Sequence, residues 1–151
     1  MRATARCNLV ITQRNEDGSV QIIRTHNMVV DVGLNMIRDL LSGTEIRTID
    51  TIQVGHGTTA AVSGDTALET WHSTHSLYPT YAPTPGAQSL LYSFVLTTVD
   101  GEMGTLSEVG LFSGTVLYAR ATFAGIHKTV ANSITFDWTL TWLDDSDIVL
   151  E

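Results

Sequence analysis

The sequence has few of the residues on which several common classes of protein depend. Cys7 is its only cysteine, so one chain cannot form an internal disulfide or a metal centre held by several thiolates. Asp, Glu, Lys and Arg make up only 16% of the 151 residues, and no Lys or Arg occurs between positions 51 and 100. No apolar run approaches the roughly 18 residues that a membrane-spanning helix needs. A lone cysteine of this kind is most often a small buried apolar residue, which is what we expect of Cys7.

The charge that is present is mostly negative. Sixteen acidic residues stand against eight basic ones, which gives a net charge of −8. Because no basic stripe is available to neutralise phosphates, the sequence does not favour a nucleic-acid partner. Acidic residues gather in the last eight positions, either as a solvated tail or as an arm that docks on a basic neighbour. These residues are Asp144, Asp145, Asp147 and Glu151.

The length fits one domain, and 43% hydrophobic residues are enough to form a core. Plentiful β-branched and aromatic residues with little charge exclude global disorder. We therefore expect a single domain over residues 1–151, with a possible N-terminal arm at residues 1–8 and an acidic C-terminal tail at residues 143–151.

One short helix is predicted, over about residues 32–41. Apolar residues recur there at helical spacing, and the charged residues Arg38 and Asp39 fall on the opposite side. The apolar face is predicted to comprise Val29, Val32, Met36, Ile37, Leu40 and Leu41. Asp31 is placed to cap the start of the helix, and Gly43 is placed to end it. Gly33 costs a helix about 1 kcal/mol relative to Ala, and we expect it to allow close packing against a sheet.

The rest of the periodic sequence predicts antiparallel strands. The pair Asp17-Gly18 between two β-prone runs is typical of a hairpin. The clearest strand is residues 134–142, where apolar residues alternate strictly with Thr and Asp. Glu108 interrupts an otherwise apolar strand, either as a solvent-facing residue or as a partner for Arg120 on the next strand. Other strands are predicted at residues 9–12, 20–24, 49–54, 90–96, 106–112 and 116–123, with a break at Ala124-Gly125.

This pattern defines the fold class that we expect. About seven strands with short connections and one helix indicate a mainly β protein, an antiparallel β-sandwich or a small barrel. Residues 55–89 lack periodic pattern and contain all three prolines. We expect an irregular interaction loop there, in which Trp71, Tyr78 and Tyr81 pack against the domain or against a neighbouring subunit.

No arrangement of residues indicates catalysis or a cofactor. Gly55 and Gly57 imitate part of a dinucleotide-binding motif, but no helix start follows them, so a tight turn at a strand end is the better interpretation. His72 and His75, with His56 upstream, would need convergence from fixed elements to bind zinc. No Gly-x-Ser-x-Gly occurs, and the carboxylates form no evident pair. We therefore predict no catalytic, metal or cofactor-binding residues.

Three segments together resemble small structural proteins of tailed-bacteriophage virions, such as capsid decoration or cement proteins, tail-fibre attachment modules and baseplate components. The resemblance covers most of residues 27–142, and its motifs are structural. The segments are Asn27–Leu41, Ile52–Leu68, and Leu106–Phe112 with its continuation through Leu117–Phe123 and Ile134–Trp142.

The resemblance implies a non-enzymatic virion protein, assembled in the host cytoplasm, which we expect to form a homotrimer. The preferred hypothesis is a capsid decoration or cement protein that stabilises the shell. Its partners would be further copies of itself and the major capsid protein or tail proteins, with no nucleic acid and no membrane. The alternatives are a tail-fibre attachment or baseplate component and, more distantly, a carbohydrate-binding β-sandwich. The candidate interface residues are Trp71, Tyr78, Tyr81, Asp144, Asp145 and Asp147.

Overall fold

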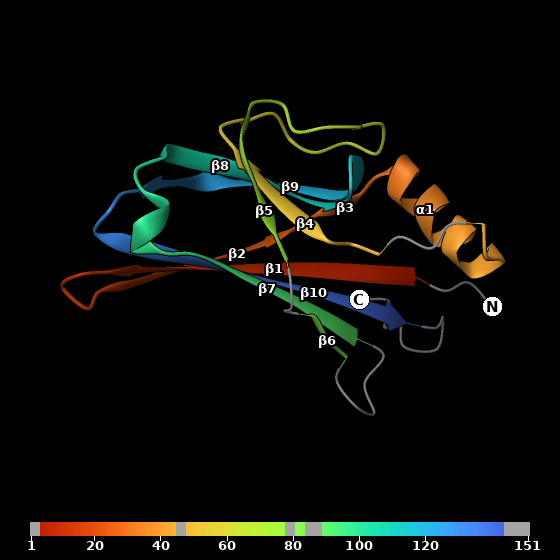
Figure 1. The fold of residues 1–151 in the computed structure, drawn as a ribbon, viewed down its shortest axis with the longest axis horizontal. Coiled ribbons are helices and arrows are strands. Elements are labelled where there is room, and N and C mark those ends of the chain that lie inside the picture. Colours follow the sequence, from red (N-terminus) through yellow and green to blue (C-terminus); the bar gives the residue numbers. More distant parts are fainter. Residues whose placement is uncertain (1–3, 45–47, 78–80, 84–88, 144–151) are drawn as a thin grey trace, which may run out of the picture.

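The computed structural model describes residues 4–44, 48–77, 81–83 and 89–143. Two open antiparallel sheets pack face to face as a β-sandwich with one helix (Figure 1). The predicted fold class is confirmed in its sandwich form. The first sheet has the order β2-β1-β10-β7-β6, with bounds Val20–His26, Thr4–Asn15, Asn132–Leu143, Ser89–Leu96 and Tyr81–Pro83. The second has the order β3-β9-β8-β4-β5, with bounds Met28–Val29, Val116–Lys128, Gly104–Ser113, Thr51–Gly55 and Trp71–Ser76.

The core between the sheets follows the alternation in the sequence. Along β10, Ile134, Phe136, Trp138 and Leu140 are buried, and the residues between them are partly exposed. Since successive side chains of a strand point to opposite faces, the Thr and Asp residues of β10 lie on the face away from the core. Cys7 is buried in the same core, as predicted, and burial raises the pKa of its thiol while the Asn27 side chain opposes that rise.

The second sheet is covered on both faces, because residues 56–70 fold over its outer side. In Figure 1 this segment arches over β8 and β9. Leu68 packs there in a small cluster with Val30, Phe112 and Leu117, separate from the main core. Residues 104–113 of β8 are consequently almost all buried, which places Glu108 beneath the arch and not in solvent.

The predicted helix is confirmed as α1, Asp31–Ser42. Val30, and not Asp31, occupies the N-cap position, so the predicted cap is wrong by one residue and Asp31 lies in the first turn. Gly43 ends the helix in the left-handed conformation at φ 75°, as expected of a C-terminal glycine. Leu41 was expected on the apolar face but is 85% exposed. Among the described residues, no helix is long and apolar enough to cross a membrane.

Gly33 allows α1 to lie directly on β9. A Cβ atom added to Gly33 would stand 2.2 Å from the carbonyl oxygen of Tyr118. The predicted reason for this glycine, close approach of helix and sheet, is therefore confirmed.

Three expectations about irregular segments need correction. Residues 4–8 are no arm, because they pair with β10 from Thr4 opposite Leu143 onward. The loop expected at residues 55–89 contains the strands β5 and β6, and within the described part only residues 56–70 and Leu77 lack regular structure. Ala124-Gly125 does not end a strand, since β9 continues to Lys128 alongside β8. Of the acidic tail expected at residues 143–151, only Leu143 is described, as the last residue of β10.

Candidate functional site

The most unusual feature of the structure is a buried ion pair on the outer face of the second sheet. Glu108 on β8 is 0% exposed, and Arg120 on β9 is 2% exposed. Arg120 Nε donates to Glu108 Oε2 at 3.0 Å, and Nη2 lies 2.9 Å from the same oxygen. Of the two interpretations open for Glu108, the partner of Arg120 is correct. A buried charge pair is tolerated only when further hydrogen bonds satisfy both groups.

Those further bonds to Glu108 come from the main chain of the segment 56–70. Gly57 N and Thr70 N donate to Oε1 at 2.9 and 2.7 Å. Glu69 N donates to Oε2 at 3.0 Å. One carboxylate therefore holds both ends of the segment, at positions 38 to 51 residues away in sequence.

Arg120 binds the middle of the same segment. Its Nη1 donates to Asp65 Oδ2 at 2.9 Å, and its Nη2 donates to the carbonyl of Thr59 at 3.1 Å. Burial alone would lower the pKa of Arg120, but its hydrogen bonds to Asp65 and Glu108 and the charges of both carboxylates raise that pKa overall. The guanidinium thus remains charged and links sheet and loop.

Glu69 closes the segment on itself. Thr59 donates to Glu69 through its backbone N–H and its hydroxyl, each at 2.8 Å. These bonds, more than the nearby Arg120, lower the pKa of Glu69. The segment from residue 56 to residue 70 is therefore held by charge-assisted hydrogen bonds at both ends and in the middle.

Gly55 and Gly57 make room for this network. A Cβ atom on Gly57 would stand 2.6 Å from Glu108 Cδ, and one on Gly55 would stand 2.3 Å from the carbonyl oxygen of Thr70. Neither glycine adopts a positive φ. The expected reason for them, a sharp turn at a strand end, is therefore wrong: they are small so that Glu108 and the incoming chain can approach.

The network positions residues and leaves no open position for proton transfer at Glu108. Its two oxygens accept from three backbone amides and from Arg120, and its side chain is fully buried. A general acid or base must reach a reacting proton within hydrogen-bond distance. The hydrogen bonds to Glu108 instead hold the backbone of Glu69 and Thr70, which leads into β5.

Trp71 is the residue next to this backbone segment, which Glu108 holds in place. It follows Thr70 directly and begins β5, the outermost strand of the second sheet. Trp71 is 59% exposed, and its indole Nε1 donates to Thr74 Oγ1 at 3.1 Å. A large apolar surface is thus displayed at a sheet edge, next to a residue whose amide is anchored on Glu108.

Comparison with known proteins gives no relative from which a role could be taken. No family model, curated protein or solved structure matches the chain.

Of the predicted interface residues, Trp71 alone has a described side chain. The backbone of Tyr81 pairs with Tyr92 in β6, on the other sheet from Trp71. Tyr78, Asp144, Asp145 and Asp147 lie outside the described residues. The sequence offered no signal for the anchoring of Trp71, because the contacts of Glu108 with residues 57, 69 and 70 depend on the fold.

Two of the five histidines, His56 and His72, are in direct contact. His56 Nδ1 lies 2.7 Å from the carbonyl of Thr105, so it carries a proton and donates. His56 Nε2 lies 3.0 Å from His72 Nδ1, and the two rings are nearly perpendicular. His75, three residues after His72 in the sequence, instead contacts Ser73 Oγ and the ring of Phe94. Burial lowers the pKa of His75. Across the described residues, no group of three or more His, Cys, Asp or Glu is arranged to hold a metal ion.

A second buried cation, Lys128, stabilises the turn regions at the other end of β9. Its Nζ donates to the carbonyls of Gly101 and Thr129 at 3.0 and 2.6 Å, and its side chain is 0% exposed. Burial lowers its pKa, against the opposing charge of Asp100. Like Arg120, it is therefore not available to an external partner.

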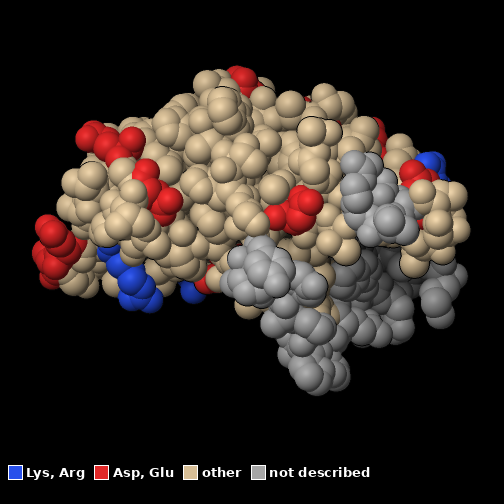
Figure 2. All heavy atoms as spheres, viewed as in Figure 1, with Lys and Arg blue, Asp and Glu red and all other residues tan. Residues whose placement is uncertain are grey.

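Among the residues whose side chains are described, exposed Lys and Arg are few. Figure 2 shows acidic side chains spread over the visible face, with basic side chains near the β1–β2 hairpin and at the helix end. Arg14 and Arg24 are exposed on that hairpin, and Arg38 is exposed on α1. This face is thus predominantly acidic and is electrostatically suited to a partner with basic groups.

Proposed function

We propose that the protein is a non-enzymatic structural component of a tailed-bacteriophage virion, and that it binds the capsid shell as a decoration or cement protein. The resemblance of residues 27–142 to small virion proteins supports this assignment. The β-sandwich supplies a rigid support for the contact surface.

The observation that carries the proposal is the presentation of Trp71. Interface anchors are enriched in Trp, and rigid anchors bind better because less conformational freedom is lost on binding. Here the amide of Thr70 donates to the buried Glu108 carboxylate at 2.7 Å, and the adjoining Trp71 is 59% exposed. A buried ion pair that holds the backbone next to an exposed aromatic at a sheet edge favours a role in surface binding.

Assembly as a homotrimer would add avidity to this contact. Several copies held on one symmetry axis bind a repeating lattice far more tightly than one copy does. A cement protein uses this effect across neighbouring shell subunits. The tail-fibre or baseplate alternative would use the same surface on a structure of low copy number.

The deciding experiment is the copy number of the protein in purified particles, measured by quantitative mass spectrometry relative to the major shell protein. Hundreds of copies support the decoration role, and particles that lack the protein should then lose their shell at lower temperature. A dozen copies or fewer would replace the capsid assignment by the tail assignment. Absence from particles would overturn both.

Carbohydrate binding is the second candidate, because an exposed indole is also a suitable surface for stacking against a sugar ring. In that case the purified protein binds glycans on an array, and Trp71→Ala abolishes the binding. No glycan binding by the wild-type protein would exclude this candidate.

A further inference from the structure

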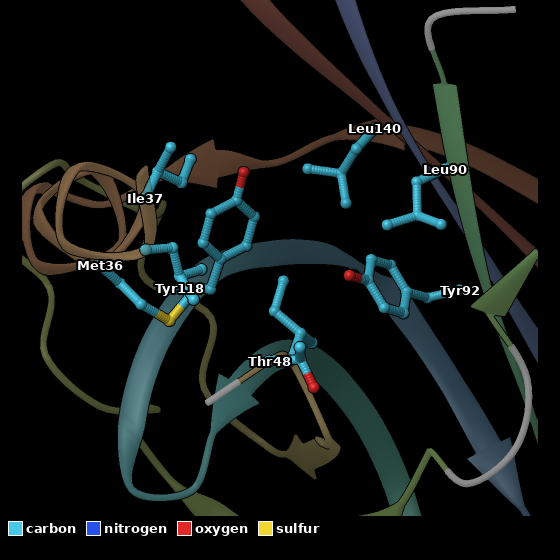
Figure 3. A pocket seen from close by; sticks show the side chains of 9 residues that line it. Met36, Ile37, Thr48, Leu90, Tyr92, Tyr118 and Leu140 are labelled. Carbon is cyan, nitrogen blue, oxygen red and sulfur yellow. The ribbon is translucent and has the colours of Figure 1, made fainter. Parts of the chain in front are cut away.

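A cavity at the helix end of the sandwich is independent of the edge that carries Trp71. Its volume is about 210 Å³, and it lies between α1 and the strands β7, β9 and β10 (Figure 3). Aliphatic side chains dominate its wall, together with Thr48 and the rings of two tyrosines. The lining residues are Met36, Ile37, Leu40, Thr48, Ile49, Leu90, Tyr92, Tyr118 and Leu140.

The hydroxyl of Tyr118 is one of the polar groups that face the cavity. This residue is only 2% exposed. In Figure 3 the hydroxyl points into the space between Ile37 and Leu140. Burial raises the pKa of the phenol, so the group keeps its proton and can donate. A ligand that accepted a hydrogen bond from this hydroxyl would gain a polar contact within a mainly apolar site.

The volume limits the size of the ligand. An engineered protein cavity of about 150 Å³ lined by similar side chains stays dry and takes up benzene, whereas pockets for drug-sized ligands begin at about 300 Å³. The cavity beside α1, at about 210 Å³, lies between these values. It therefore suits one substituted aromatic ring or a compact aliphatic molecule with a single polar group.

We propose that this cavity is a binding site for a small, mainly apolar molecule whose one polar group accepts a hydrogen bond from Tyr118. The apolar body of the ligand would contact Leu40, Leu90 and Leu140, which approach from three different elements. The binding would not involve Trp71 or the Glu108–Arg120 pair, and it would stabilise α1 against the sheets.

The test uses phenol and toluene as probes, because the two molecules have nearly the same shape and only phenol carries a hydroxyl. Binding to the purified full chain is followed by NMR chemical-shift changes at millimolar probe concentration. We expect both probes to shift residues around the cavity and phenol to bind about 3- to 10-fold more tightly, the gain from one net hydrogen bond. Failure of both probes to bind would overturn the proposal.

Variants separate the two parts of the proposal. Tyr118→Phe keeps the ring and removes the hydroxyl, so it should lower phenol affinity to that of toluene and leave toluene binding unchanged. Leu40→Trp should fill the cavity and abolish both. Leu41→Trp is the matched control, because Leu41 is its neighbour on α1 but is 85% exposed, and it should bind both probes as the wild type does. Unaltered phenol binding in Tyr118→Phe, or in a folded Leu40→Trp variant, would contradict the site.

Discussion

At the scale of single residues, Glu108 is the residue on which the second sheet and its covering segment depend. Its carboxylate receives Arg120 and three backbone amides without any exposure to solvent. A buried pair of this kind adds little net stability compared with an apolar replacement of both partners, but loss of one partner is costly. The two partners are not equivalent here, because only Glu108 holds the backbone of residues 57, 69 and 70.

We therefore predict that Glu108→Leu destabilises the protein more than Arg120→Met does. The first change leaves the Arg120 charge without its main partner and removes the acceptor of three amides. We expect it to cost about 3–5 kcal/mol of unfolding free energy, measured by urea denaturation. Glu102→Gln, at an exposed position, should change stability by less than about 0.5 kcal/mol. An equal or larger loss in Arg120→Met would contradict the role given to the carboxylate.

Gly57 allows a second prediction, with a control in the same segment. Gly57→Ala places a methyl group 2.6 Å from Glu108 Cδ, whereas a Cβ on Gly64 meets nothing within 4 Å. We expect Gly57→Ala to cost about 1–3 kcal/mol, as overpacking does, and Gly64→Ala to cost less than about 0.5 kcal/mol. Thermal unfolding of the two variants beside the wild type checks this. Equal melting temperatures would show that the glycine is not required for the approach of Glu108.

At the scale of elements, the docking of α1 on β9 is expected to reverse the usual effect of replacing a helical glycine by alanine. Gly→Ala inside a helix usually stabilises it by about 1 kcal/mol. At Gly33 the new methyl group would meet the Tyr118 backbone at 2.2 Å, so the helix must move away from β9. We predict a net loss of about 1–3 kcal/mol for Gly33→Ala, and a change below about 0.5 kcal/mol for Asn35→Ala at an exposed position of the same helix. Stabilisation by Gly33→Ala would refute the close approach.

The segment 56–70 is expected to respond to acid through Glu69. Hydrogen bonds from Thr59 lower the pKa of Glu69 below its ordinary 4.5, so the folded state favours the ionised form. The stabilisation is therefore fully present above the ordinary pKa and is lost as the pH falls through the lowered one. We predict that Glu69→Gln reduces the loss of stability between about pH 6 and pH 2, measured by urea unfolding. Glu16→Gln, in the exposed β1–β2 turn, should follow the wild-type profile, and a parallel response in both variants would contradict the assignment.

At the scale of the whole molecule, the strands with a clear apolar pattern were predictable, and the short or mainly polar strands β3, β5 and β6 were not. The period of β10 is visible because one face meets the core and the other is polar. In β5, by contrast, polar residues occupy nearly every position, because an edge strand with half-exposed side chains has no strongly apolar face. β9 passes through Ala124-Gly125 because pairing with β8 extends to Lys128, and tertiary pairing overrides a weak local signal.

The candidate site was predictable only in its parts. The sequence identified Glu108 and Arg120 as possible partners on adjacent strands, and it identified Trp71 as a possible anchor. It did not connect them, because the hydrogen bonds from Gly57 and Thr70 to Glu108 span 51 and 38 residues. Contacts of that range are selected by how the loop closes over the sheet, which no local pattern encodes.

The link from Glu108 through Thr70 to Trp71 leads to a final prediction about the whole molecule. It distinguishes an effect on binding from an effect on folding. Because Trp71 is 59% exposed, Trp71→Ala should leave the melting temperature within about 2 °C of the wild type. If the edge of the second sheet is the contact surface, the same change should weaken rebinding to particles that lack the protein by a factor of about 30, the effect of an interface anchor worth about 2 kcal/mol. Val130→Ala is the control, since Val130 is 64% exposed in the turn between β9 and β10, and it should bind normally. Normal rebinding of Trp71→Ala would move the contact surface away from β5 while leaving the fold as described.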